Sequence, residues 1–215
     1  MKMAQTEIDK TGRNFSRIVI LAMALSGMAA LAYEVVANEV LFFFFDSSSY
    51  SMATVLSSFL AGLAIGSFLI SKTSDRIKNK RTVFAAMQIA IGAYAVFFLS
   101  NLEAVPYLLS IFYKWSAGSI ELLLLSKFAI SIAYFSFPTI LLGASFPLAA
   151  SLLVKKAKDT GKDIGTLYSA DLVGAIAGAM LSGFFLIPIL GLKTACFAGA
   201  IINSLSALLI MEKKK

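Results

Sequence analysis

The sequence predicts an all-α integral membrane protein with six transmembrane helices. The first observation is composition, because 59% of the 215 residues are hydrophobic and 14% are charged, whereas soluble domains average about 45–50% apolar and about 25% charged residues. The second is that the apolar residues come in blocks of about 20, the length that crosses a bilayer. The third is that the basic residues gather in the segments between and beyond these blocks.

Six segments have the length and apolarity of membrane spans. They form one expected transmembrane domain over residues 17–211, between an N-terminal tail (1–16) and a basic C-terminal tail (212–215). The expected spans are 17–44, 49–71, 82–101, 119–154, 165–190 and 193–211. The first is expected to remain uncleaved, because its apolar run continues well beyond the A-x-A triplet at 30–32.

The fourth span is too long for one upright helix and too short for two spans with a turn. It contains Pro138 and Pro147, and a proline inside a helix removes a backbone donor and bends the helix. We therefore expect one long, kinked helix. The preceding stretch 104–116 is expected to lie at the membrane interface, where Tyr and Trp side chains are favoured.

The basic residues predict the orientation of the chain. Sixteen of the nineteen Lys and Arg residues lie in the N-terminal segment to Arg17, in 72–81, in 155–163 and at the C-terminal end. With six spans, all four segments fall on the same side of the membrane. Because cytoplasmic segments carry the Lys/Arg excess, the sequence predicts a multi-pass protein of the cytoplasmic (inner) membrane with both termini in the cytoplasm.

The same composition argues against several classes of function. The chain has no His and one Cys, Cys196, so it cannot form an internal disulfide or a cysteine–histidine metal cluster. We expect neither a metal nor another cofactor, and the net charge of +7 is explained by the basic loops, so no nucleic-acid partner is expected. The segments between the spans are short, and we expect no catalytic residues in them.

Small residues recur at the spacing that lets membrane helices approach closely. Ser58, Gly62 and Gly66 follow one another at steps of four in the second span, and Gly174 and Gly178 form a G-x-x-x-G pair in the fifth. These residues are expected to pack helices against each other.

Four polar residues inside the spans form the candidate site: Glu34, Asn38, Lys127 and Asp171. Ionisable groups at such depths are rare and are expected to face the bundle interior. Helical rise places Glu34 about 25 Å from the inner side and Lys127 about 12 Å from the outer side, so we expect the two to form an ion pair. That pair either fixes helix register or lies on the path of a solute. Asp171 either caps its own helix or adds to the site, and Glu39 is expected to be solvated near the outer surface.

The loop after the second span, "GSFLISKTSDRIKNKR", resembles the basic loop between helices two and three of major facilitator superfamily transporters. Asp75, Arg76, Lys80 and Arg81 take the places of the family's latch residues. Lys127 falls where that family has an Arg in its fourth helix. This resemblance implies a six-helix half of a transporter.

Longer stretches resemble the membrane domain of bacterial spermidine-synthase-like proteins. They are "SGMAALAYEVVANEVL", "YSMATVLSSFLAGLAIGSFL", "FPTILLGASFPLAASLL" and "GTLYSADLVGAIAGAMLSGFFLIPILGL". In that family such a domain is commonly joined to a cytoplasmic aminopropyltransferase-like domain. The chain departs from the family pattern after "YEVV", where Ala37, Asn38 and Glu39 stand instead of Trp, a polar residue and Arg.

Two functions remain open on the sequence. The first is a non-catalytic membrane module that anchors or regulates a separate protein subunit, such as a synthase-like enzyme or a membrane complex. The second is a half-size transporter that forms a homodimer and moves a cationic or amine solute past Glu34, Asn38 and Asp171. In both cases the expectation is that the chain is not itself an enzyme, and its surroundings are the lipid bilayer.

Overall fold

The computed structural model describes residues 2–45, 49–101, 104–115, 119–154 and 160–212, and no β-strand occurs in these ranges. The helices in chain order are α1 (Lys2–Phe45), α2 (Ser49–Thr73), the short 3₁₀ turn η1 (Ser74–Arg76), α3 (Lys80–Ser100), α4 (Ala104–Trp115), α5 (Ile120–Leu153), α6 (Thr160–Leu181), η3 (Ser182–Leu190) and α7 (Gly191–Met211). This agrees with the predicted all-α class. In lipid a helix satisfies all of its own backbone groups, which explains why apolar blocks of this length fold this way.

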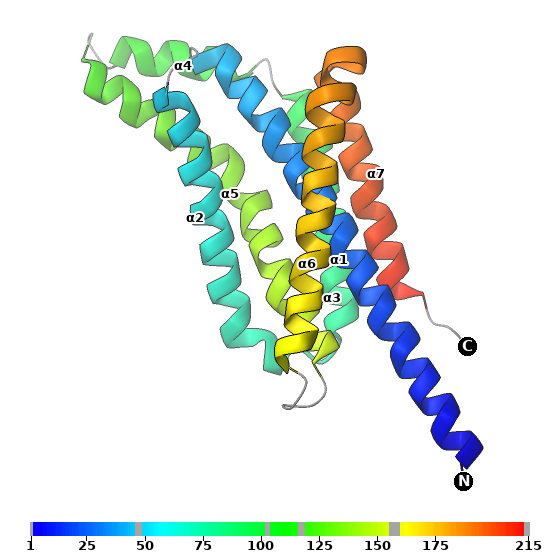
Figure 1. The fold of residues 1–215 in the computed structure, drawn as a ribbon. Helices are drawn as coiled ribbons and strands as arrows, with labels where there is room; N and C mark the ends of the chain where they lie inside the picture. The colour runs from blue at the N-terminus through cyan, green and yellow to red at the C-terminus, as the bar shows by residue number, and fades with distance from the viewer. Residues whose placement is uncertain (1, 46–48, 102–103, 116–118, 155–159, 213–215) are drawn as a thin grey trace.

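Among the described residues, five helical segments are long and apolar enough to cross a membrane: Asn14–Phe42, Met52–Arg76, Lys80–Ser100, Ile120–Leu153 and Thr160–Met211. The last is 52 residues long, which would be about 78 Å as a straight helix against a hydrocarbon core of about 30 Å. The backbone breaks within it at Gly191, whose φ of 83° is a conformation that favours glycine. From there α7 returns toward the terminal end of the bundle (Figure 1).

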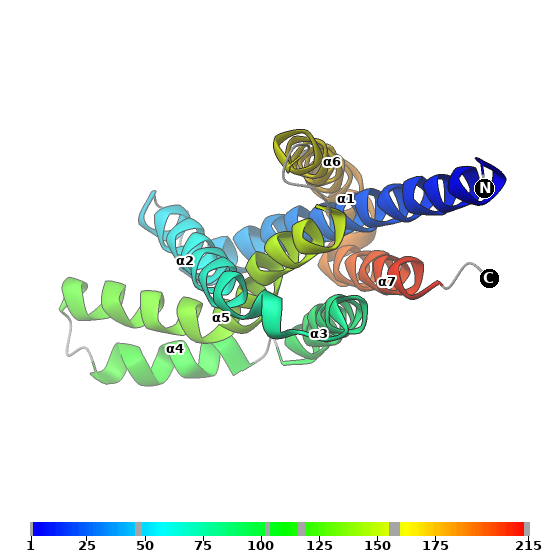
Figure 2. The same cartoon turned by 90° about the horizontal axis from the view of Figure 1, so that it is seen from below.

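Both chain ends lie at one end of the bundle, together with the turn from α2 to α3 (Figure 1). The short helix α4 lies across the opposite end (Figure 1). We call these the terminal end and the α4 end. Seen along the bundle, α2 and α6 lie on one side of α1 and α5, while α3 and α7 lie on the other (Figure 2).

Local signals define the helix starts that are not set by apolarity alone. The side chain of Asn79 accepts a hydrogen bond from the Thr82 amide at 3.4 Å at the start of α3. Ser119 does the same for Leu122 at the start of α5, at 3.4 Å. Such side chains satisfy backbone donors that the first helical turn leaves without a partner.

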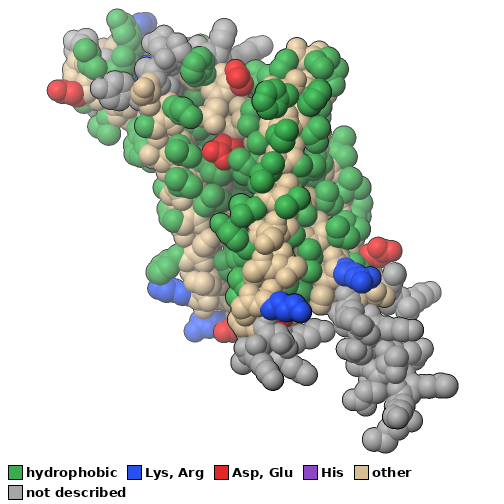
Figure 3. All heavy atoms as spheres, in the orientation of Figure 1, with side chains coloured by type: hydrophobic (Ala, Val, Ile, Leu, Met, Phe, Trp, Pro, Cys, Tyr) green, Lys and Arg blue, Asp and Glu red, His purple; other side chains and the backbone are tan. Residues whose placement is uncertain are grey.

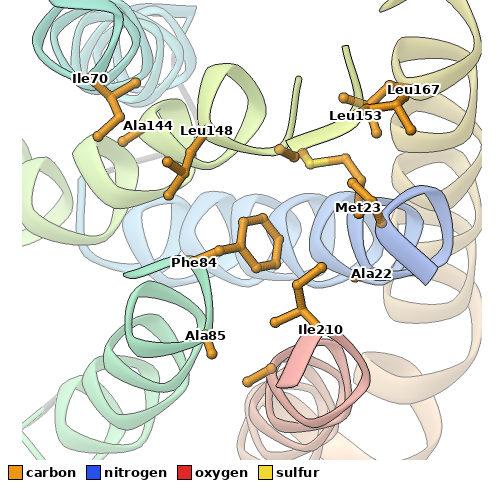
Figure 4. Close-up of a cluster of buried hydrophobic side chains, with 13 residues drawn as sticks. Ala22, Met23, Ile70, Phe84, Ala85, Ala144, Leu148, Leu153, Leu167 and Ile210 are labelled. Carbon is orange, nitrogen blue, oxygen red and sulfur yellow. The ribbon is translucent and has the colours of Figure 1, made fainter. Parts of the chain in front are cut away.

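The largest buried cluster lies in the half of the bundle near the terminal end. Its members come from α1, α2, α3, α5, α6 and α7 (Figure 4). Phe84 of α3 is 1% exposed, and Leu148 of α5 and Leu167 of α6 are fully buried. The outer surface is apolar as well, and hydrophobic side chains are spread along most of the visible length of the helices (Figure 3). A bundle that is apolar outside as well as inside is suited to lipid.

The two prolines of α5 are accommodated by hydroxyl groups from neighbouring helices. Because proline has no N–H, the carbonyl four residues earlier loses its helical donor. For Pro138 that carbonyl belongs to Tyr134, and it accepts a hydrogen bond from the Tyr94 hydroxyl of α3 at 2.5 Å. For Pro147 it belongs to Gly143, and it accepts from the Ser67 hydroxyl of α2 at 2.8 Å. The kink that the sequence predicts in this helix stays a prediction.

Candidate functional site

The site that the sequence predicts is positioned by two closely packed helix pairs. In the first pair, α1 and α6, a side chain at Gly174 would collide with the carbonyl of Ala24, and one at Gly178 would collide with that of Met28. The absence of side chains at these two glycines therefore lets the backbones of α1 and α6 touch. This contact sets the position of every polar residue on the facing sides of the two helices.

The second pair is α2 and α5. A side chain at Gly62 would meet Thr139, and one at Gly66 would meet the backbone of Ile140. Gly143 of α5 in turn lies against the backbone of Leu63. Ser58 is buried one turn earlier in α2, and its hydroxyl donates to the carbonyl of Thr54 at 2.7 Å.

Asp171 lies in the seam between α1 and α6. Its carboxylate and its backbone carbonyl both stand where a side chain at Gly27 would be, so Gly27 makes room for the acidic group. The helix α6 begins at Thr160, five residues before the predicted start, so Asp171 lies beyond the first turn in which a carboxylate interacts with the helix dipole.

Gly27 connects Asp171 with the other predicted acidic residue. On α1, Gly27, Glu34 and Asn38 share one face, because they are separated by seven and four residues. Glu34 and Asn38 are both partly buried. The structure thus brings Asp171 to the same face of α1 as Glu34, about 10 Å apart along the helix axis.

Lys127 occupies a partly buried position in the first half of α5. Its backbone carbonyl accepts a hydrogen bond from the Ser131 hydroxyl at 2.9 Å. The ion pair between Glu34 and Lys127 stays a prediction, which a double-mutant cycle with Glu34→Gln and Lys127→Met would test.

The sequence argument missed a set of buried polar groups between α1, α3, α5 and α7. Gln88 of α3 is fully buried, and its side-chain amide donates to the hydroxyls of Ser26 at 2.9 Å and Ser145 at 3.3 Å. Asn203 of α7 is also fully buried and donates to the Tyr33 hydroxyl at 3.3 Å. A side-chain amide inside an otherwise apolar span is itself a sequence signal, because such a group needs partners in lipid.

These polar groups keep unused hydrogen-bonding capacity. The side-chain oxygens of Gln88 and Asn203 are buried and have no hydrogen-bond partner among the described residues. Tyr33, which accepts the hydrogen bond from Asn203, also lines a small cavity of about 40 Å³ in the α4 half of the bundle. The rest of that cavity is almost entirely apolar, with aromatic side chains from Phe59, Tyr94, Phe98 and Phe135.

The latch-like loop lies at the terminal end. Asp75 and Arg76 belong to η1, and Lys80 and Arg81 begin α3. The guanidinium group of Arg81 lies 3.9 Å from the centre of the Phe15 ring, a cation–π contact that ties the start of α3 to α1. The resemblance of this loop to a transporter latch stays a prediction.

The described residues offer no obvious metal centre. Among them no group of three or more His, Cys, Asp or Glu side chains could hold a metal ion. Cys196 is buried as a free thiol in the apolar cluster of the α4 half.

Comparison with known proteins gives distant relatives of one kind. The chain is 22% identical over 197 residues to a polyamine aminopropyltransferase of Corynebacterium efficiens, which covers 90% of this chain and 34% of that protein. It is 21% identical over 193 residues to polyamine aminopropyltransferase 2 of Ralstonia nicotianae and 24% identical over 195 residues to polyamine aminopropyltransferase 2 of Streptomyces coelicolor. Each of these matches covers 87% of this chain. No family model and no solved structure matches the chain.

The chain therefore spans about a third of the length of the curated relatives that it matches. This distant similarity is consistent with the predicted resemblance to a spermidine-synthase-like membrane domain. It contradicts the expectation that the chain is not an enzyme, because the matched relatives are named as enzymes. That expectation was wrong because it rested on the shortness of the segments between the spans. The length of these segments does not show whether a helical bundle is related to part of an enzyme.

Proposed function

We propose that this chain is the membrane-embedded part of a polyamine aminopropyltransferase system, and that it holds an aminopropyltransferase unit at the membrane. The observation that carries the proposal is the coverage of the similarity. It includes 87–90% of this chain but only about a third of each relative, so the matched part of those proteins corresponds in length to the helical bundle. The other two-thirds of each relative are long enough to form a further unit. For this chain, such a unit would lie on the same polypeptide or on a second one.

The membrane association rests on the apolar helices. Five segments have the length and composition of membrane spans. Because the fifth breaks at Gly191 and is far longer than a bilayer is thick, we propose that it crosses twice, which gives six spans. The basic turn from Lys72 to Arg81 lies at the terminal end (Figure 1), which supports a cytoplasmic location for both termini.

Cysteine labelling in intact bacteria tests this topology. In a Cys196→Ala background, a membrane-impermeant maleimide is expected to label Ser119→Cys in α5 and to label Lys162→Cys in α6 only after the cells are permeabilised. Labelling of Lys162→Cys in intact cells would overturn the proposed orientation. Equal labelling of both positions would contradict an odd number of crossings between them.

The proposed function is tested by asking where aminopropyl transfer is found. The tagged chain is expressed in the organism that encodes it and purified in mild detergent. The purified material is expected to carry an activity that transfers an aminopropyl group from a sulfonium donor to a diamine, measured by the mass of the product. Purified protein with intact helices and no such activity would count against the proposal.

A matched pair of variants shows whether that activity depends on the bundle. Gly174→Leu would force a side chain into the backbone of Ala24, whereas Gly165→Leu on the same helix meets nothing within 4 Å. We expect Gly174→Leu to lose the associated activity and Gly165→Leu to keep it. Equal activity of the two variants would mean that the bundle does not hold the catalytic unit.

A further inference from the structure

A cavity of about 280 Å³ opens between α1 and α2 at the α4 end of the bundle. Among the described residues, the side chains that line it are Asn38, Glu39, Phe42, Met52 and Val55. Three of them come from the last turns of α1 and two from the first turns of α2. The volume is slightly below the range of about 300–1,000 Å³ that is usual for small-molecule sites, so the cavity suits a ligand of a few heavy atoms.

The residues that line the cavity favour one chemical class of ligand, a cation with an aliphatic part. Glu39 supplies a carboxylate and Asn38 a side-chain amide, and none of the described residues that line the cavity is basic. The other walls are an aromatic ring, a thioether and a branched aliphatic group. A carboxylate attracts and accepts hydrogen bonds from an ammonium group, an aromatic ring face adds a cation–π attraction, and apolar walls cover an aliphatic stem.

The surroundings of the cavity strengthen its preference for cations. Glu34 lies one helical turn below Asn38 on the same face of α1 and is partly buried. A carboxylate within an apolar bundle interacts more strongly with a nearby charge than it would in water. Glu34 therefore places a second carboxyl group near the cavity, in addition to that of Glu39.

We propose that this cavity binds the primary ammonium group of an aliphatic amine, with Glu39 as its charged partner and Asn38 as a hydrogen-bonding partner. Such a group can come from a free alkyl diamine or from the ethanolamine headgroup of a membrane lipid. The proposal concerns binding at the α4 end and does not depend on aminopropyl transfer. Its test measures binding alone, so its failure is distinguishable from failure of the proposed function.

The free amine is tested with the full chain in nanodiscs of phosphatidylcholine. Isothermal titration with 1,4-diaminobutane is expected to show binding, and 1,4-butanediol, which has no charge, is expected to show none. Glu39→Gln is expected to weaken diamine binding at least about tenfold, because a charge-assisted hydrogen bond is lost. Glu121→Gln removes an exposed carboxylate from the first turn of α5 and is expected to leave binding unchanged.

The lipid source is tested with native mass spectrometry of the chain from nanodiscs that contain equal amounts of phosphatidylethanolamine and phosphatidylcholine. If the headgroup is the natural occupant, the wild type retains phosphatidylethanolamine and Glu39→Gln loses that preference. If only the diamine binds and depends on Glu39, the free amine is the occupant. The proposal is overturned if neither ligand binds, or if both bind Glu39→Gln as well as they bind the wild type.

Discussion

The two halves of the bundle differ in how their interiors are filled. In the half near the terminal end, Phe84, Leu148 and Leu167 are almost completely buried in one cluster that joins six helices (Figure 4). The half near α4 has its own buried cluster, yet it also contains the small aromatic cavity and the larger cavity beside Glu39. Both partly buried residues of the predicted site on α1, Glu34 and Asn38, belong to this less filled half.

This difference suggests that the two halves of the same helices contribute differently to stability and to ligand binding. Helices in lipid associate through close packing, because leaving lipid gives apolar side chains no hydrophobic gain. The filled half is therefore expected to contribute most of the packing energy. The half with cavities is the part that can accept a ligand without disturbing that packing.

The largest effect is expected from opening the filled half. Phe84→Ala would leave a space inside the cluster of six helices, and we expect a loss of at least about 2 kcal/mol in the free energy of unfolding, which is the low end for large-to-small core changes because the transfer term is weak in lipid. The measurement is thermal or denaturant unfolding in detergent micelles.

The control for this change lies on the same helix. Phe97 of α3 is 60% exposed, so Phe97→Ala removes lipid-facing atoms without making an internal space, and we expect little change in stability. If the two variants are destabilised equally, the filled half has no special role and the contrast between the halves is lost.

Removing one hydroxyl donor from each half is expected to have a smaller effect on stability. Each half contains one proline of α5, and a hydroxyl of a neighbouring helix donates to the carbonyl that this proline frees. Tyr94→Phe removes the donor to the Tyr134 carbonyl, and Ser67→Ala removes the donor to the Gly143 carbonyl. Each change is expected to lower the free energy of unfolding by about 1 kcal/mol. The two carbonyls are about 13 Å apart along the helix, so the double variant should show additive losses.

Tyr107→Phe provides the reference for removing a tyrosine hydroxyl, because Tyr107 of α4 is 69% exposed. We expect no change in its unfolding midpoint. An unchanged midpoint for Tyr94→Phe as well would mean that the carbonyl freed by Pro138 does not need the hydroxyl.

The sequence by itself determined the helical class, the existence of long apolar segments and the places of the small residues, because apolarity, length and spacing are local properties of a chain in lipid. It indicated α4 as a separate short element from its aromatic residues. It also singled out Glu34, Asn38 and Asp171 as unusual, because a polar group in a span is visible in the sequence without any knowledge of its neighbours.

Only the tertiary structure decided how these groups are placed relative to one another. Asp171 reaches the face of α1 that carries Glu34 because Gly27 and Gly174 let α1 and α6 touch, and no local pattern states which helices become neighbours. The same holds for Gln88 with Ser26, and for Tyr94 with the carbonyl that Pro138 frees. A hydrogen bond or a cavity between helices depends on how the helices cross and turn against each other, and those quantities are set by packing over the whole bundle.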